Sequence, residues 1–199
     1  MRGNYHHGNL RAALLDEGMR RLETVDENSL SLREIAKRCG VSPGAPYAHF
    51  KNKDEYLSAL ADRIMQELAK KLEATRRQYT GTDDVLIEMG LTYILFFAEN
   101  PYFFSLLTSE SHHAEAVFWN KNKGLNVAFK VLEDVAEPIL QQAHIPDEDR
   151  YNTLLAMWAM VHGLASIVYV PGISARLKED PAGGRHLRSI LSAFTDHYG

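Results

Sequence analysis

Apolar residues recur at helical spacing along most of the chain. Small or apolar residues at every fourth position from Leu10 to Leu22 predict an amphipathic helix over about residues 9–23. A second stripe, at every fourth position from Tyr56 to Leu72, predicts a longer helix from Asn52 to about Tyr79. No stretch alternates apolar and polar residues between hairpin turns, so we expect no strands. The pattern predicts an all-α fold.

Two short helices are predicted between these longer ones. Residues 31–34 have the pattern of a capping box, in which the Ser31 hydroxyl accepts a hydrogen bond from the Glu34 amide. That helix should stop at Gly40, and Ser42 with Pro43 should begin the next, which ends near residue 50. Two short helices joined by a tight turn form a helix-turn-helix, whose second helix enters the major groove of DNA.

Prolines and glycines divide the second half of the chain into further helices, which we expect over about residues 82–99, from Asn100-Pro101 onward, and over 120–143 and 185–198. The segment Leu154–Val170 is almost wholly apolar. Its length is close to that of a membrane-spanning helix. Polar residues interrupt it and no second span accompanies it. A helix buried by its own core on one side and by a partner on the other is therefore the favoured interpretation, and it predicts a dimer.

The residues Leu32–Ala36, Cys39–Lys53 and Tyr56–Leu57 form one long, ordered motif. With their surroundings, residues 10–60, they resemble the DNA-binding domain of the TetR/AcrR family of bacterial transcriptional regulators. Trp158–Gly163 resembles the element of a subgroup named for Trp-His-Gly. The resemblance implies an N-terminal three-helix helix-turn-helix domain over residues 1–53. It also implies a connecting helix over 53–79 and a C-terminal helical bundle over 80–199 for ligand binding and dimerisation.

The same resemblance implies a set of DNA-contacting residues: Arg33, Ser42, Gly44, Ala45, Pro46, Tyr47, His49 and Lys53. Tyr47 and Lys53 would meet the phosphate backbone, and His49 would lie on the groove-facing side of the reading helix. Pro46 departs from the broad family and removes a backbone donor from the interface. Base reading would therefore rely on few side chains.

Aromatic residues are frequent in the second half of the chain, where small-molecule pockets need mostly apolar walls with a few polar groups. The candidate ligand-binding residues are Tyr93, Phe97, Phe103, Phe104, Trp119, Trp158 and His162. Core packing alone is an alternative explanation for most of these aromatics, and a hydrogen-bonded core histidine is one for His162. We expect a small apolar effector, no cofactor and no metal, because the pair His112-His113 lacks the spacing of a metal-binding motif.

The net charge is distributed unevenly between the two parts of the chain. The 199 residues carry a formal net charge of −4, which alone disfavours a nucleic-acid partner. Residues 1–53, however, hold 9 lysines and arginines against 6 acidic residues, a net +3, whereas residues 54–199 hold 13 against 20, a net −7. The excess acid is thus expected away from the phosphates. The single cysteine, Cys39, fits a reducing, cytoplasmic location.

These observations predict a homodimeric regulator that binds double-stranded DNA, most simply a repressor released from a palindromic operator by a small-molecule inducer. A transcriptional activator of the same family is the alternative within this class. A helical-bundle enzyme without DNA affinity is a second alternative, although the sequence holds no phosphate loop, nucleophile elbow or HExxH motif. A membrane-anchored helical protein is the third.

Overall fold

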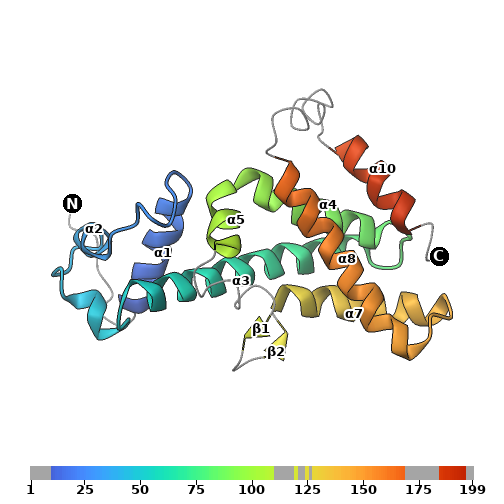
Figure 1. Ribbon diagram of the computed structural model, residues 1–199, viewed down its shortest axis with the longest axis horizontal. Coiled ribbons are helices and arrows are strands. Elements are labelled where there is room, and N and C mark those ends of the chain that lie inside the picture. Colours follow the sequence, from blue (N-terminus) through green and yellow to red (C-terminus); the bar gives the residue numbers. More distant parts are fainter. Residues whose placement is uncertain (1–9, 110–118, 121–123, 126, 169–183, 196–199) are drawn as a thin grey trace. The chain divides into compact units, whose positions relative to one another are not determined.

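The computed structural model describes residues 10–109, 119–120, 124–125, 127–168 and 184–195 (Figure 1). Most of these residues lie in helices, which confirms the predicted all-α class. Contacts between Cα atoms divide the chain into two units: Met1–Ile64 with Asn100–Gly124, and Met65–Glu99 with Leu125–Gly199. The division falls inside one long helix rather than near residue 80, where we had expected the C-terminal domain to begin.

The first unit contains α1 (Leu10–Leu22), α2 (Leu32–Arg38), the 3₁₀ helix η1 (Ala45–Ala48), the start of α3 (Lys53–Tyr79) and α5 (Pro101–Thr108). Helix α5 was predicted as part of the C-terminal bundle. It belongs instead to the unit of α1 and α2, where the Ser105 hydroxyl donates a 3.3 Å hydrogen bond to the buried Glu27 carboxylate. Glu27 lies in the loop between α1 and α2, so this bond joins α5 to that loop.

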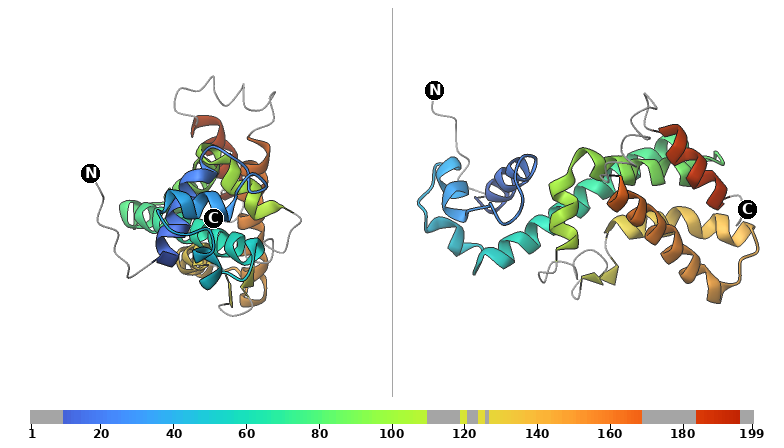
Figure 2. Two further views of the ribbon diagram at one scale, coloured as in Figure 1. Left: turned by 90° about the vertical axis from the view of Figure 1, so that its left-hand side faces the viewer. Right: turned by 45° about the horizontal axis from the view of Figure 1, so that its top comes forward.

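The second unit contains the rest of α3, α4 (Val85–Glu99), α7 (Val127–Gln142), α8 (Asp147–Ile167) and α10 (Gly184–Thr195). Helix α4 contacts α7, α8 and α10, and Figure 2 shows these helices gathered around it. Its buried residues lie on several sides of the helix, as expected for an element at the centre of a bundle. This helix therefore supplies much of the core of the second unit.

Local sequence signals set several helix starts as predicted. The Asn52 side chain accepts a 2.8 Å hydrogen bond from the Glu55 amide at the start of α3, and Asn100 precedes Pro101 at the first position of α5. Ser31 occupies the N-cap of α2, but its side chain makes no capping bond, so the predicted capping box is wrong.

Two other helices begin later in the chain than predicted. Thr82 does not begin α4, which starts at Val85, because its hydroxyl donates to the Tyr79 carbonyl instead. Helix α7 begins at Val127 rather than near residue 120. Two-residue strands, β1 (Trp119–Asn120) and β2 (Gly124–Leu125), pair before it, where no strands were expected.

Helices α8 and α10 each have one buried and one exposed face. On α8, Leu154, Trp158 and Ala165 are buried, whereas Leu155 is 41% exposed. On α10, Ile190 was predicted to share the inner face with its leucines, yet it is 45% exposed. Among the described residues, no helix is both long and apolar enough to span a membrane.

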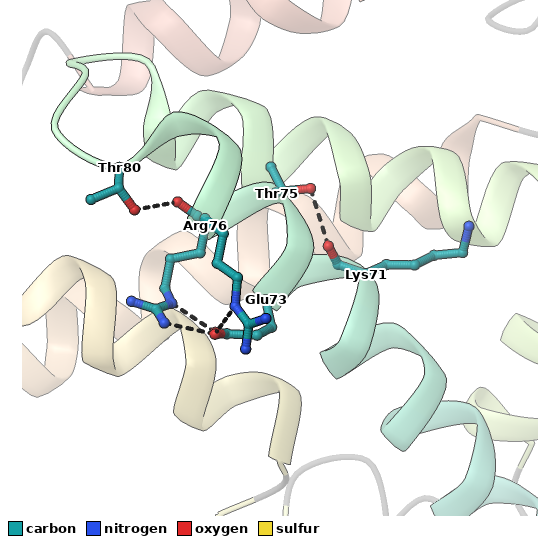
Figure 3. A network of polar contacts seen from close by, with 6 residues as sticks. Lys71, Glu73, Thr75, Arg76 and Thr80 are labelled. Carbon is teal, nitrogen blue, oxygen red and sulfur yellow. Dashed lines mark hydrogen bonds and ion pairs between the residues drawn. The ribbon is translucent and has the colours of Figure 1, made fainter.

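A cluster of charged side chains marks the end of α3 in the second unit. Figure 3 shows the Arg76 side chain reaching toward Glu73, with Nη2–Oε1 and Nε–Oε2 distances of 2.6 and 2.7 Å. Arg77 Nε lies 3.0 Å from the same carboxylate. The hydrogen bond from Arg76, reinforced by Arg77, lowers the pKa of Glu73 to about 2. A carboxylate placed one turn before two arginines stabilises the helix locally.

Candidate nucleic-acid interface and apolar pocket

A compact set of contacts fixes the angle between α1 and α2 in the first unit. Ala36 is fully buried where the helices approach, and Cys39 is buried with its thiol donating to the Ala13 carbonyl at 3.6 Å. Gly40 then turns the chain with a φ of +72°, a conformation that costs glycine little. The Val41 amide closes the turn onto the Ala36 carbonyl at 3.0 Å. These residues form the turn that the helix-turn-helix pattern predicted.

Tyr56 joins α3 to α1 inside this core. Its ring is fully buried, and its hydroxyl donates a 2.7 Å hydrogen bond to the Leu14 carbonyl. Burial raises the pKa of Tyr56 strongly, so the hydroxyl keeps its proton and stays a donor. Gly18 makes this approach possible, because a Cβ atom at that position would lie 2.0 Å from the Tyr56 hydroxyl oxygen. The apolar stripe of α1 contains a glycine at this position because α1 and α3 approach each other closely there.

Glu17 is a buried acid that the apolar pattern did not reveal. Its side chain is 4% exposed, and its carboxylate lies 2.6 Å from Arg20 and 3.7 Å from Arg38. A buried carboxylate requires such partners, because removing its charge from water without compensation is costly. Since Arg38 ends α2, this pair adds an electrostatic contact between α1 and α2. The signal available in the sequence was its place beside Leu14 and Gly18 on the inner face of α1.

The segment expected to read DNA is shorter than predicted. An α-helix was expected from Ser42 to near residue 50, but only Ala45–Ala48 is helical, and it is a 3₁₀ helix. Its bonds span three residues, from the Tyr47 amide to the Gly44 carbonyl at 3.1 Å and from the His49 amide to the Pro46 carbonyl at 2.9 Å. Pro46 lacks the amide that would bond to the Ser42 carbonyl in an α-helix starting there, which accounts for the shorter 3₁₀ segment.

Most of the predicted DNA contacts are on the surface of the first unit. Exposed members are Arg33, Ser42, Gly44, Tyr47 and His49, and Ala45 is partly exposed. Tyr47 is 52% exposed although it is a large aromatic residue. One member differs from the expectation, since Pro46 is buried. Lys53 is partly exposed and donates a 3.0 Å hydrogen bond to the Asn28 carbonyl.

Phe50 is a core residue, as expected, and it connects η1 to both neighbouring helices. It is 1% exposed, and its ring meets that of Tyr56 edge-on with centroids 5.0 Å apart. The guanidinium of Arg11, on α1, lies 5.2 Å from the Phe50 centroid, within the range of a cation–π contact. The exposed Tyr47 lies on η1 and the exposed His49 directly follows it, and the next residue, Phe50, is anchored in the core.

The second unit contains an apolar pocket, with about 50 Å³ of free space. Residues from α3, α4, α7, α8 and α10 line it: Leu72, Leu86, Ile87, Met89, Gly90, Tyr93, Leu132, Met157, Trp158, Met160, Val161 and Leu191. This volume accommodates a few solvent-sized molecules, so the walls must move to admit a larger ligand.

The pocket includes two of the predicted ligand-binding residues, Tyr93 and Trp158. Phe97 and His162 lie beside it, since each contacts Tyr93. Phe103 and Phe104 are buried in α5 of the first unit and are not among the residues that line this pocket. The side chain of Trp119 lies outside the described residues, as does the segment that holds His112-His113.

Tyr93 is the polar centre of the aromatic cluster beside the pocket. Its hydroxyl lies 2.8 Å from Nδ1 of His162, and its ring meets that of Trp158 edge-on with centroids 5.0 Å apart. Burial strongly raises the pKa of Tyr93 and lowers that of His162, so both groups are neutral near pH 7. The alternative that His162 is a hydrogen-bonded histidine of the core agrees with this geometry.

Comparisons with known proteins point to one class of regulator. Residues 14–60 match the model of a family described as bacterial regulatory proteins, tetR family. An uncharacterised HTH-type transcriptional regulator from Haemophilus influenzae is 24% identical over 166 residues, which cover 83% of this chain and 77% of the relative. The matched segment contains α2, the turn and η1, which are the elements described above.

Solved structures share the fold over nearly the whole chain. A protein of unknown function from Rhodococcus sp. RHA1 superposes with a TM-score of 0.68 and 22% identity, covering 99% of this chain and 97% of that one. A TetR variant from Acinetobacter baumannii AYE, solved in complex with minocycline, has a TM-score of 0.62 and 19% identity, with 95% and 98% covered. Residues 14–60 are therefore similar to the tetR family of bacterial regulatory proteins, and the chain as a whole shares its fold with these solved structures.

Proposed function

We propose that this protein is a dimeric repressor that binds a palindromic operator and is released from it by a small, mostly apolar inducer. The observation that carries the proposal is the exposed pair Tyr47, on η1, and His49, directly after it, held by a buried and hydrogen-bonded core. Groove-reading side chains must be exposed and fixed at once, and this segment has both properties. Arg33 and Ser42 are exposed in the same motif and would supply further contacts.

The exposed apolar residues of α8 and α10 support the dimer. Tyr151, Leu155 and Ile167 on α8 are 53%, 41% and 39% exposed, and Ile190 on α10 is 45% exposed. A second copy that covers these residues would remove them from water, and a two-fold axis would place two reading segments on two half-sites. Leu155→Asp is expected to give a monomer in sedimentation, whereas Val127→Asp, at a similarly exposed residue of α7, should leave the dimer intact. Dimers of both variants would contradict this interface.

Release would follow from a difference in affinity between two forms of the protein. An inducer that binds a form with a wider pocket more tightly shifts the population toward that form. If that form binds DNA more weakly, the two ligands oppose each other by the same factor, whichever binds first. The minocycline complex of the structural neighbour from Acinetobacter baumannii supports a ligand site in this fold. The pocket of the second unit is the proposed site here.

Gel shift of the purified chain on DNA from its own promoter region tests the proposal. Specific binding in the nanomolar range is expected, and His49→Ala should weaken it by about tenfold, the effect of losing one good base contact. His144→Asn is the matched control, because His144 is exposed in the second unit and its φ of 59° suits asparagine. Failure of the parent protein to bind at moderate salt would overturn the proposal. In vitro transcription from the same promoter distinguishes the repressor from the activator.

A further inference from the structure

The walls of the pocket carry no charge that a ligand could pair with. Among the described residues that line it, Tyr93 and Trp158 are the polar ones, and the others are aliphatic side chains, methionines and Gly90. Tyr93 is neutral because burial raises its pKa, and its hydroxyl already pairs with His162. A charged ligand would lose its hydration here without gaining a counter-ion, which is strongly unfavourable.

Trp158 presents a hydrogen-bond donor without an acceptor. The side chain is 1% exposed, and Nε1 has no hydrogen-bond partner among the described residues. Its ring is instead surrounded by aromatic neighbours, with the centroids of Tyr93 and Phe129 at 5.0 and 5.4 Å. A buried N–H that has left water and gained no acceptor destabilises the protein, and native structures rarely keep one. Trp158 is also one of the residues that line the pocket.

We propose that the effector is an uncharged, mostly apolar molecule whose carbonyl or ether oxygen accepts a hydrogen bond from Trp158 Nε1. This inference rests on the proposed function, since it names the chemical class of the ligand that the sensor pocket selects. Apolar contacts with the methionines and leucines supply most of the affinity, and the indole N–H supplies the selectivity.

The size of the pocket limits how the ligand enters. The free space is about 50 Å³, so even a five-carbon ligand must displace parts of the wall. Met157 and Met160 have flexible side chains that can repack around it. Gly90 marks the tightest part, because a Cβ atom there would lie 3.1 Å from both Cδ atoms of Leu191 and 3.3 Å from Cγ1 of Val161. An added methyl group at residue 90 would therefore fill space that the ligand needs.

Three probes of one shape test the proposal on the full-length chain. 2-Pentanone has the apolar chain and a carbonyl acceptor, 2-methyl-1-pentene replaces the oxygen with a methylene group, and butanoate adds a negative charge. The chain has two tryptophans, so its ¹H–¹⁵N NMR spectrum contains two indole signals, and Trp119→Phe identifies that of Trp158. We expect 2-pentanone to move the Trp158 signal downfield, the alkene to bind without this shift, and butanoate not to bind.

Two variants separate the hydrogen bond from the shape of the pocket. In Trp158→Phe, the ratio of ketone to alkene affinity should fall about tenfold, because the donor is lost while the apolar walls stay. Gly90→Ala keeps the donor but narrows the pocket, so it should weaken the ketone and the alkene alike. If Trp158→Phe does not fold, the three probes on the parent chain and on Gly90→Ala still decide the matter.

Two results would overturn the inference: butanoate binding as tightly as the ketone, or ketone binding that leaves the Trp158 indole signal unmoved. Neither result bears on DNA binding, which is measured by gel shift without any probe. A chain that binds its promoter but fails the probe test keeps the proposed regulator and loses the inferred ligand class. A chain that binds the ketone but no DNA keeps the ligand class and loses the regulator.

Discussion

The cores of the two units differ in how completely their buried polar groups are paired. In the first unit the buried polar side chains Glu17, Glu27, Cys39 and Tyr56 each have a partner, at distances between 2.6 and 3.6 Å. In the second unit, Trp158 has a buried donor without an acceptor, and a pocket lies beside it. In the first unit the buried polar side chains named here are all paired, whereas in the second unit one buried donor has no acceptor among the described residues.

The difference follows from what each core must do in the proposed regulator. A segment that presents a few side chains to base edges must keep them in one geometry, and fully paired buried groups select one arrangement. A sensor must instead gain free energy when its ligand arrives, so unfilled space and an unmet hydrogen bond are useful there. The buried core of the first unit is expected to resist added atoms, and the core of the second unit to tolerate losses at its polar groups.

The largest expected effect is at the contact of α1 with α3. Gly18→Ala would place Cβ 2.0 Å from the Tyr56 hydroxyl oxygen and 2.9 Å from Cδ2 of Leu60. Relieving this clash must move α3 or break the tyrosine hydrogen bond, so we expect the free energy of unfolding to fall by about 3 kcal/mol. Urea unfolding followed by circular dichroism measures the change. Gly44→Ala is the control, because Gly44 has nothing within 4 Å and should stay within about 0.5 kcal/mol of the parent.

The second test compares one tyrosine hydroxyl in each core. Tyr56→Phe removes a 2.7 Å bond to a buried carbonyl and should cost about 1.5 kcal/mol. Tyr93→Phe removes a 2.8 Å bond to His162, which is only half-buried, so water can replace the lost partner and the cost should be about 0.5 kcal/mol. Urea unfolding of both variants gives the ratio. Equal losses would show that the two cores do not differ in the way described.

The sequence alone predicted many of the helices in both units, but it did not predict how the buried polar groups pair. The stripes of α1 and α3 and the starts at Asn52 and Asn100 depend on residues close in sequence, and they were predicted well. The pairing of Tyr93 with His162 joins residues 69 positions apart, and spacing alone does not encode it. The same holds for Ser105 with Glu27, which draws α5 into the first unit.

The candidate reading segment illustrates a local failure. Ser42 and Pro43 resemble a helix start, and the prediction followed that signal. Pro46 removes the amide that would bond to the Ser42 carbonyl, and in so short a segment this loss outweighs the start signal. The motif placed Tyr47 and His49 correctly on the surface but gave the wrong side for Pro46, because periodicity differs between 3₁₀ and α-helices. Composition likewise could not predict which apolar side chains of α8 and α10 are exposed, since this depends on which face of each helix packs on α4.

The third prediction concerns pH and the half-buried histidine of the second unit. Burial holds the pKa of His162 below its ordinary value of 6.5, so the unfolded chain binds this proton more readily than the folded one. Above about pH 6.5 both states are neutral here, and the stability of the second unit should fall as the pH drops below that value. Fluorescence of Trp158, whose ring lies 5.0 Å from that of Tyr93, follows the unfolding in a Trp119→Phe background. His162→Asn should remove this part of the pH dependence.

The smallest effect is expected at the charged cluster that ends α3, which is outside both cores. The pKa of Glu73 is lowered to about 2 by Arg76 and Arg77, so its stabilising contribution is complete above its ordinary pKa of 4.5. It should be lost as the pH falls from about 4.5 to 2, and added salt should weaken it because the groups are exposed to solvent. Glu73→Gln should flatten the stability profile over that window more than Glu67→Gln, since Glu67 forms its ion pair with Lys70 instead of two arginines. Equal profiles for the two variants would mean that the arginines add nothing beyond an ordinary surface pair, and differences between the units would then lie in their buried groups alone.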